Sequence, residues 1–233
     1  REFCKEIFEK IVVEHGQGFL GWRSIPTDNS DIGQGAKATQ PIFEQIFISA
    51  TKRGGPANNS GGGDQLDFER KLYVIRKQVE NVIRSSGLRE GRSFYITNIS
   101  SRTFIYKGLL MPGQLDNFFI DLKDSCLESA LCLVHSRYST NTFPTWDLAQ
   151  PFRFLAHNGE INTLRGNINS VSARERLIAS DLFGTDIEKL KPVIVEGGSD
   201  SSAMDNFFEL LTLSGRSLEQ AMMMLIPAAW EHD

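Results

Sequence analysis

An asparagine and a glycine that follow an apolar run are the most informative pair in the chain. Asn158 and Gly159 lie just past the largely apolar run 152–156, with His157 between. If that run is a strand, the Asn158 carboxamide and the Gly159 N–H emerge at the sheet edge, where both can donate to a developing oxyanion. Two preorganised donors suit acyl transfer. An Asn-Gly pair taken alone is more common in turns, so the residues on either side must decide.

Two charged residues indicate what is held beside this pair. Arg137 stands at the end of the apolar segment 130–134, and its guanidinium can clamp a carboxylate with two parallel hydrogen bonds. Asp200 lies in a Gly-Ser turn ahead of a helical pattern, where its carboxylate can receive an α-ammonium group. Together with Asn158 and Gly159, these residues describe a pocket for an α-amino acid whose side-chain amide is attacked. The substrate indicated is L-glutamine.

At these residues the chain closely resembles the class II glutamine amidotransferases, and the wider sequence resembles the amidotransferase domain of the glutamate synthase large subunit. The likeness runs nearly end to end. It includes CKEIFEKIV at 4–12, ERKLYVIRK at 69–77, SSRTFIYKGLL at 100–110, VHSRYSTNTFP at 134–144, AQPFRFLAHNGEINTLRGN at 149–167, GGSDS at 197–201 and LSGRSLEQAMMMLIPAAW at 213–230. Matches of this length and order are far more specific than a short motif.

The resemblance implies roles for single residues. Arg137 and Asp200 would hold the α-carboxylate and α-amino groups of glutamine, and Thr140 would also line the pocket. Asn158 and the Gly159 N–H would form the oxyanion hole. The implied activity is the glutaminase part of glutamate synthase, which hydrolyses glutamine through a γ-glutamyl thioester and passes ammonia to a distant synthase site.

The resemblance also implies what the complete enzyme contains. Its synthase domains, on the same polypeptide, would combine the ammonia with 2-oxoglutarate, using FMN and an iron–sulfur cluster. None of the residues that bind those cofactors is expected in this chain. The electron donor stays open between NAD(P)H, supplied through a partner or another domain, and ferredoxin.

One departure from the family concerns the nucleophile. Family members begin their mature chain with Cys-Gly, whose thiol attacks the amide while its free α-amine is the general base. Residue 1 is arginine here, and no Cys-Gly dipeptide occurs. Cys4 lies in a helical pattern, and the family shows the same CKEIFEK sequence well downstream of its nucleophile, so we interpret Cys4 as a buried or half-buried helix residue. We therefore expect residues 1–233 to be an internal piece of the domain that is inactive by itself.

Two other functions fit the same residues. One is the same domain attached to another synthase, such as an amidophosphoribosyltransferase or a sugar-phosphate aminotransferase. The stretches at 69–77 and 100–108 favour glutamate synthase over these. The other function is a catalytically silent binding or regulatory module that retains the amino-acid pocket. A Cys-Gly start upstream of Arg1 would support catalysis, and its absence would support the silent module.

Composition narrows the class of protein. The net charge of −4 and the dispersed Lys and Arg residues argue against a nucleic-acid surface. Basic pairs among apolar neighbours, at 70–71 and 76–77, are interpreted as a solvated helix face. No run approaches the roughly 18 apolar residues of a membrane span. The cysteines at 4, 126 and 132 lack metal or redox spacing, which favours a reducing compartment, cytoplasmic or plastid.

Periodicity predicts a layered α+β domain. The predicted helices extend to about residue 15 and over 68–83, 167–179, 202–213 and 218–226, and the predicted strands are 41–48, 94–99 paired with 103–106, 130–134 and 152–156. Gly87 is expected to stop the helix over 68–83, and the Gly- and Asn-rich residues 53–64 are expected to form a mobile insertion. The family resemblance implies the four-layer αββα sandwich of the N-terminal nucleophile hydrolases.

Several shorter patterns have ordinary structural interpretations. The G-x-G-x-x-G sequence at 16–21 is read as a turn, because no helix follows to receive a pyrophosphate. His135 and His157 lack a third metal ligand, so each is expected to brace a neighbouring functional residue through a hydrogen bond. The serines at 199, 201 and 202 are expected to cap the following helix, and the methionines at 222–224 are expected to pack in the core.

Overall fold

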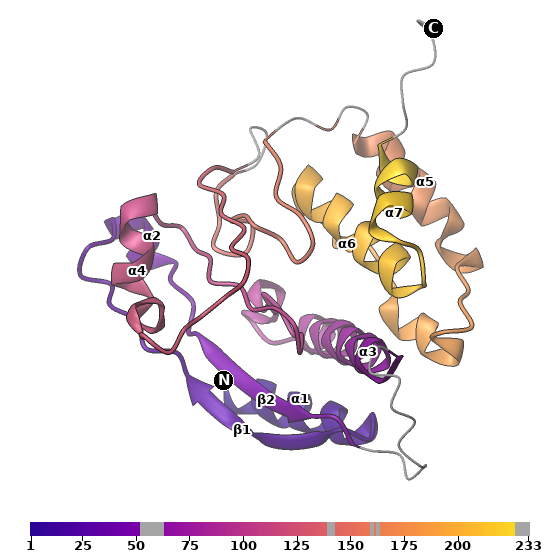
Figure 1. Cartoon of the computed structure of the whole chain (residues 1–233), viewed down its shortest axis with the longest axis horizontal. Coiled ribbons are helices and arrows are strands. Elements are labelled where there is room, and N and C mark those ends of the chain that lie inside the picture. Colours follow the sequence, from indigo (N-terminus) through magenta and orange to yellow (C-terminus); the bar gives the residue numbers. More distant parts are fainter. Residues whose placement is uncertain (52–62, 139–142, 159–160, 162–163, 227–233) are drawn as a thin grey trace, which may run out of the picture.

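A computed structural model describes residues 1–51, 63–138, 143–158, 161 and 164–226 of the chain (Figure 1). The described part combines helices with one two-stranded antiparallel sheet. This agrees with the predicted mixture of helix and strand. The described residues do not show four layers, so the αββα sandwich stays a prediction.

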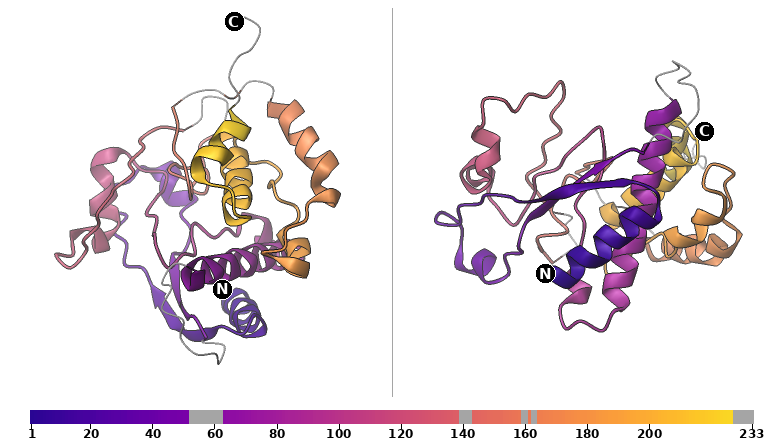
Figure 2. Two further views of the ribbon diagram at one scale, coloured as in Figure 1. Left: turned by 45° about the vertical axis from the view of Figure 1, so that its right-hand side comes forward. Right: turned by 90° about the horizontal axis from the view of Figure 1, so that it is seen from below.

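Helix α3 (Gly63–Ser85) runs through the middle of the molecule (Figures 1 and 2). Helix α1 (Glu2–Glu14) packs on one side of it, and helix α6 (Asp200–Leu213) with the 3-10 helix η5 (Gly184–Leu190) packs on another. The sequence predicted α1 and α3 correctly. As predicted, Gly87 follows the end of α3 with φ +77°, a left-handed conformation that favours glycine.

The two sides of α3 belong to two separate apolar clusters. Ile75, Val79 and Ile83 pack with buried residues of α1, and Cys4 is half-buried against the same cluster, as predicted. Tyr73 and Val74 belong to the second cluster, which they share with residues of η5 and α6. Because apolar residues cover α3 on both sides, this helix has almost no solvated face along its middle.

The prediction of a solvated face for the basic residues of α3 is wrong at its second pair. Arg76 and Lys77 are each only 1% exposed. The prediction failed because it assumed that α3 lies on the surface, whereas two elements distant in the sequence cover it. Arg70 and Lys71, one to two turns earlier, are half-buried and reach partners at the rim.

The sheet is a hairpin of β1 (Gly18–Ser24) and β2 (Glu44–Ser49), with Phe19 opposite Ile48 and Trp22 opposite Ile46. Strand β2 was predicted, but β1 was not. The sequence at 16–21 was interpreted as a turn only, and this is corrected by the structure: Gly16 turns the chain with φ +66°, and Gly21, with φ +144°, lies at a bulge within β1. Glycines at a turn and at a bulge hid the strand between them.

A third cluster fills the lobe beyond the hairpin, which Figure 1 shows at the left. It joins helix α2 (Gln34–Ala38) to helix α4 (Leu115–Phe118). Edge-to-face aromatic contacts hold it together, with the Phe43 ring 5.8 Å from those of Phe118 and Trp146. Short 3-10 turns connect the surrounding loops: Gly91–Ser93, Pro112–Gln114 and Ile120–Lys123.

The predicted pair of strands at 94–99 and 103–106 is not formed. Polar side chains satisfy the backbone of these segments instead of a strand ladder. Glu80 accepts a hydrogen bond from Ile96 N at 3.1 Å, and Asn98 Nδ2 donates to Thr103 O at 2.7 Å. The two segments do lie side by side, as expected, but the Asn98 side chain joins them in place of backbone hydrogen bonds between strands.

Two further predicted strands, 130–134 and 152–156, are also absent from the structure. In the first, Leu131 is 83% exposed and Val134 is 71% exposed, so neither side chain is covered in the way that a strand within a packed sheet would be. In the second, Phe152 N donates to Leu155 O at 2.9 Å, which closes a tight turn. That turn forms because Arg153 and Phe154 contact helix α6.

The C-terminal part is helical, as predicted. Helix α5 (Leu164–Arg174) continues into a 3-10 turn over Glu175–Leu177, and α7 (Leu218–Leu225) packs against α6. Ser217 caps α7 through the N–H of Gln220. The expected core role of the methionine triplet is wrong, because Met223 is 73% exposed and its two neighbours are 37% and 55% exposed. Those side chains lie on the outer face of a short terminal helix.

Within the described ranges, no helix is both long enough and apolar enough to cross a bilayer. The predicted insertion at 53–64 lies almost entirely outside the described residues.

We expect Ile75→Ala to reduce the free energy of unfolding by about 2–5 kcal/mol, because it leaves a cavity between α1 and α3. Ile75 is 0% exposed. Val82→Ala on the same helix is the control, since Val82 is 37% exposed and its truncation should cost at most about 0.5 kcal/mol. Urea unfolding of both variants measures the difference, and equal losses would contradict the central position of α3.

Candidate functional site

Asp200 opens helix α6 and faces the loop of Asn158. Ser199 is the N-cap: its hydroxyl accepts a hydrogen bond from Ser202 N at 3.1 Å, so the predicted capping role is confirmed for Ser199. The Asp200 carboxylate is half-buried and accepts from Ile161 N at 3.3 Å. The structure therefore brings Asp200 and the segment that follows Asn158 together across 39 residues of sequence.

Asn158 itself is exposed, so its carboxamide is accessible to a small molecule. It follows the tight turn at 152–155, whose direction is set by contacts with α6. Gly159, the second predicted oxyanion donor, lies outside the described residues, as does Thr140. The pairing of Asn158 with Gly159 therefore stays a prediction.

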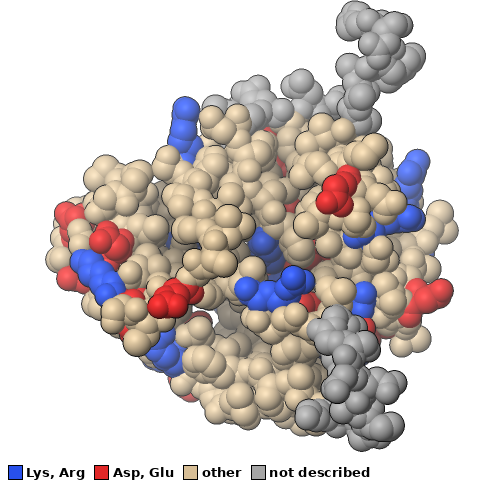
Figure 3. All heavy atoms as spheres, viewed as in Figure 1, with Lys and Arg blue, Asp and Glu red and all other residues tan. Residues whose placement is uncertain are grey.

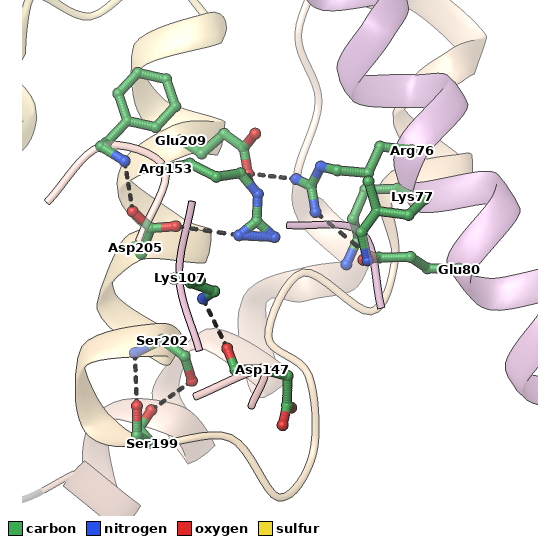
Figure 4. A network of polar contacts seen from close by, with 12 residues as sticks. Arg76, Lys77, Glu80, Lys107, Asp147, Arg153, Ser199, Ser202, Asp205 and Glu209 are labelled. Carbon is green, nitrogen blue, oxygen red and sulfur yellow. Dashed lines mark hydrogen bonds and ion pairs between the residues drawn. The ribbon is translucent and has the colours of Figure 1, made fainter. Parts of the chain in front are cut away.

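A buried ion-pair network holds this turn against α6 (Figure 4). Arg153 Nη1 lies 3.3 Å from Asp205 Oδ2, and Arg153 Nε lies 3.6 Å from Glu209 Oε2. The other oxygen of Asp205 accepts a hydrogen bond from Phe154 N at 2.8 Å. Asp205 is 0% exposed, so its charge is compensated entirely by neighbouring groups of the protein.

Helix α3 completes the network from the other side. Arg76 Nη2 lies 2.5 Å from Glu209 Oε2, and Arg76 Nη1 lies 3.4 Å from Glu80 Oε2. Glu209 thus lies between Arg76 and Arg153. Five charged side chains from α3, α6 and the 152–155 turn therefore form one cluster, in which charged groups of opposite sign alternate.

The cluster shifts the protonation equilibria of its members. Burial alone would lower the pKa of Arg153, but Glu209 and Asp205 outweigh it and hold this pKa above the ordinary value. Burial alone would raise the pKa of Glu80, but Arg76 and Arg153 keep it lowered. Arg153 and Glu80 consequently stay charged at neutral pH.

Two buried lysines next to the cluster have lowered pKa values. Burial, assisted by the charge of Arg153, lowers the pKa of Lys107 to about 7. Its Nζ donates to Asp147 O at 2.7 Å and lies 4.6 Å from the centre of the Phe152 ring. Burial likewise lowers the pKa of Lys77 to about 8, and Lys77 Nζ donates to the carbonyl oxygens of residues 192 and 193.

Arg137 lies in a different, exposed segment. Its backbone N–H donates to His135 Nδ1 at 3.1 Å, so the predicted bracing by His135 is confirmed. The following residue, Tyr138, donates its hydroxyl to Gly108 O at 3.3 Å, which ties this segment to the residue after Lys107. The role of Arg137 as the carboxylate clamp stays a prediction.

A surface groove, a set of metal ligands or a patch of surface charge would each indicate an alternative functional site. A groove of about 610 Å³ is lined by residues 177–182 and the C-terminal half of α6, away from Asn158, Asp200 and Arg137. Among the residues that the structure describes, no group of three or more His, Cys, Asp or Glu could hold a metal ion. Lys and Arg are interspersed with Asp and Glu on the face that Figure 3 shows, without a patch of one sign.

The ion-pair network was not predicted from the sequence. Two signals could have found it: Arg76 and Glu80 are four residues apart on the apolar stretch of α3, and Asp205 and Glu209 have the same spacing in α6. Arg76 and Glu80 can pair within their own helix, whereas two acids at helical spacing inside an apolar stretch need basic partners from another element. Their mutual contact, however, depends on the packing of α3 against α6.

Comparison with known proteins defines the class. The family model of the glutamine amidotransferases class-II matches residues 1–233, and the chain belongs to this family. It is a glutamine amidotransferase domain homologous to glutamate synthase large chains, as predicted.

Three relatives show the breadth of this homology. The chain is 50% identical over 230 residues to the glutamate synthase [NADPH] large chain of Bacillus subtilis, covering 99% of the chain and 14% of that relative. It is 45% identical to the glutamate synthase [NADH] of Schizosaccharomyces pombe, covering 100% of the chain and 11% of the relative. It is 38% identical to the chloroplastic ferredoxin-dependent glutamate synthase of rice (Oryza sativa subsp. japonica), covering 99% and 14%. The chain therefore spans about one seventh or less of these relatives.

We expect Glu209→Gln to destabilise the fold by about 3–5 kcal/mol, because it leaves two buried guanidinium groups with too little negative charge. Glu188→Gln is the control: Glu188 pairs with Lys191 at 2.7 Å, but its side chain is 69% exposed, so the loss should be at most about 1 kcal/mol. Urea unfolding at neutral pH compares the two variants. A Glu209→Gln variant as stable as the control would contradict the importance of the network.

Proposed function

We propose that this chain is part of the glutaminase domain of a glutamate synthase, in which L-glutamine and water give glutamate and ammonia. The observation that carries the proposal is the contact between the Asp200 carboxylate and the backbone of Ile161, three residues after Asn158. A group suited to an α-ammonium ion thus lies beside a loop that presents a carboxamide donor. Membership of the amidotransferase family supports the same reaction.

The proposed roles follow from the chemistry of each group. Asp200 accepts hydrogen bonds from the α-ammonium group, and Arg137 clamps the α-carboxylate, with Thr140 lining the pocket. A thiolate attacks the side-chain carbonyl, and the C–N bond then breaks. Ammonia departs, and the γ-glutamyl thioester that remains is hydrolysed by water. Asn158 Nδ2 and Gly159 N–H stabilise the oxyanion of both tetrahedral intermediates.

The nucleophile of this reaction is proposed to lie outside the 233 residues. Cys4 is half-buried in α1, packed against the apolar cluster of α1 and α3. Cys126 and Cys132 are exposed, and their backbone nitrogens, like that of Cys4, are in peptide bonds. Neither arrangement supplies a thiol with an adjacent free α-amine, which the family resemblance implies for the attacking group.

The remaining chemistry of a glutamate synthase is proposed to belong to other domains of a longer polypeptide. Those domains would use ammonia and 2-oxoglutarate with FMN and an iron–sulfur cluster. The described residues do not fit such a cluster, because they contain no suitable group of cysteines or other ligands. The names of the relatives include NADPH, NADH and ferredoxin, so the electron donor is left open.

The four-layer sandwich is proposed for the complete domain. Exposed apolar side chains support it, since Leu131, Leu133 and Val134 are 54–83% exposed in a segment with strand-like composition. An additional strand beside this segment would cover them and satisfy its backbone hydrogen bonds.

In a full-length protein that contains this chain, we expect Asn158→Ala and Arg137→Ala to separate turnover from binding. Asn158→Ala should lower kcat for glutamine roughly a hundredfold or more with little change in KM, because the donor acts mainly on the tetrahedral intermediate. Arg137→Ala should raise KM, because a charge-assisted contact worth about 1.5–3 kcal/mol is lost. Ammonia-dependent synthesis should survive in both variants. A near-normal KM for Arg137→Ala would contradict the clamp, and equal loss of both activities would indicate misfolding.

The position of the nucleophile can be tested with the 233-residue chain itself. We expect no glutamine hydrolysis and no labelling of a cysteine by a glutamine-like electrophile, because no thiol here has the required base. Mass spectrometry after incubation with the electrophile measures the labelling. Glutamine turnover by this chain that Cys4→Ser abolishes would overturn the proposal.

A further inference from the structure

The side chain of Gln150 holds the peptide that precedes Asn158. Gln150 Oε1 accepts a hydrogen bond from His157 N at 3.0 Å, and Gln150 Nε2 donates to His157 O at 3.2 Å. The Gln150 side chain is buried, with the residue only 6% exposed. A carboxamide offers one acceptor and a donor in a fixed plane, so this pair of bonds sets both the place and the orientation of the His157 backbone.

The ring of the same histidine reaches the first turn of α6. His157 Nε2 lies 2.7 Å from Ser201 Oγ, and Ser201 Oγ lies 3.1 Å from Asp200 Oδ1. A hydroxyl group has a single proton. If Ser201 donates it to the Asp200 carboxylate, His157 must donate from Nε2 to Ser201, which fixes the tautomer of the ring. Ser201 is 0% exposed, so water does not compete for these bonds.

We infer that Gln150 and His157 are positioning residues that hold the oxyanion donor Asn158 at a fixed place relative to Asp200. This inference rests on the proposed glutaminase function. Gln150 fixes the backbone from which the Asn158 side chain projects, and the His157 ring joins that backbone to the helix turn that bears Asp200. Neither residue needs to contact the substrate to perform this role.

The rate of the reaction depends on how precisely the oxyanion donor is placed. The tetrahedral intermediate is stabilised only if the donor already points at the place where the negative charge develops. A misplacement of about 1 Å can cost on the order of a hundredfold in rate. Asn158 is exposed, and the two hydrogen bonds of Gln150 act on it through the backbone of the residue before it.

The fold contains a matched control for Gln150. Gln114 is also buried, at 8% exposed, and also holds two backbone groups: its Oε1 accepts from Met111 N at 2.9 Å and its Nε2 donates to Asp31 O. It belongs to the lobe of α2 and α4, and these two hydrogen bonds join it to residues 31 and 111, which are distant in the sequence from the 150–161 segment. Replacing either glutamine by methionine removes two similar bonds and preserves the side-chain length.

The experiment uses the full-length protein and measures kcat and KM for glutamine, ammonia-dependent synthesis and thermal unfolding. We expect Gln150→Met to lower kcat tenfold or more, with KM within twofold of wild type and ammonia-dependent synthesis retained. Gln114→Met should keep the wild-type kcat at a similar loss of melting temperature. In the double variant Gln150→Met with Asn158→Ala, kcat should be no lower than in Asn158→Ala alone, because both act through the same donor.

Each alternative outcome has a definite meaning. A wild-type kcat in Gln150→Met, a fall in kcat matched by Gln114→Met, or multiplicative losses in the double variant would overturn the positioning role. If Gln150→Met does not fold, Ser201→Ala removes the hydroxyl that links the His157 ring to Asp200 and leaves the two hydrogen bonds of Gln150 in place. This variant should raise KM and lower kcat, and unchanged values would overturn the inference. Absence of glutaminase activity in the wild-type protein would instead refute the proposed function.

Discussion

The burial of the Arg153 guanidinium constrains the rest of this structure. A largely buried cation must have anions placed around it, and Asp205 and Glu209 of α6 supply them. Glu209 in turn contacts Arg76 of α3. Three segments that are far apart in the sequence therefore meet at one point, because a shift of any of them would leave a buried charge without compensation.

This constraint also determines the candidate site. Arg153 precedes Asn158 by five residues, and Asp205 follows Asp200 by five residues in α6. The loop that carries Asn158 and the helix that carries Asp200 are thus joined by the ion pair of Arg153 and Asp205, close to both functional groups. Apolar contacts alone tolerate sliding of one element past another, whereas ion pairs with hydrogen bonds fix the register. This is the physical reason that a polar cluster lies next to the site.

The sequence predicted the elements whose signals are local. Helices α1, α3, α6 and α7 have apolar periodicity, a serine cap or a glycine stop within a few residues, and these signals do not depend on the rest of the fold. Strands 94–99, 130–134 and 152–156 were predicted wrongly, because a strand depends on a partner that local composition does not reveal. In two of the three, buried acidic side chains, Glu80 and Asp205, bind the backbone instead.

The site shows the same division between local and distant information. Residue types at Asn158 and Asp200 indicated an amide substrate, and the contact of Asp200 with Ile161 agrees with that neighbourhood. Burial of Arg76 and the contact of His157 with Ser201 could not be inferred, since both depend on how α3 and α6 pack. A charged residue is predicted to be solvated unless its helix is known to be covered on both sides. The groups that perform chemistry can thus be found from the sequence, whereas the groups that hold them in place emerge only from the fold.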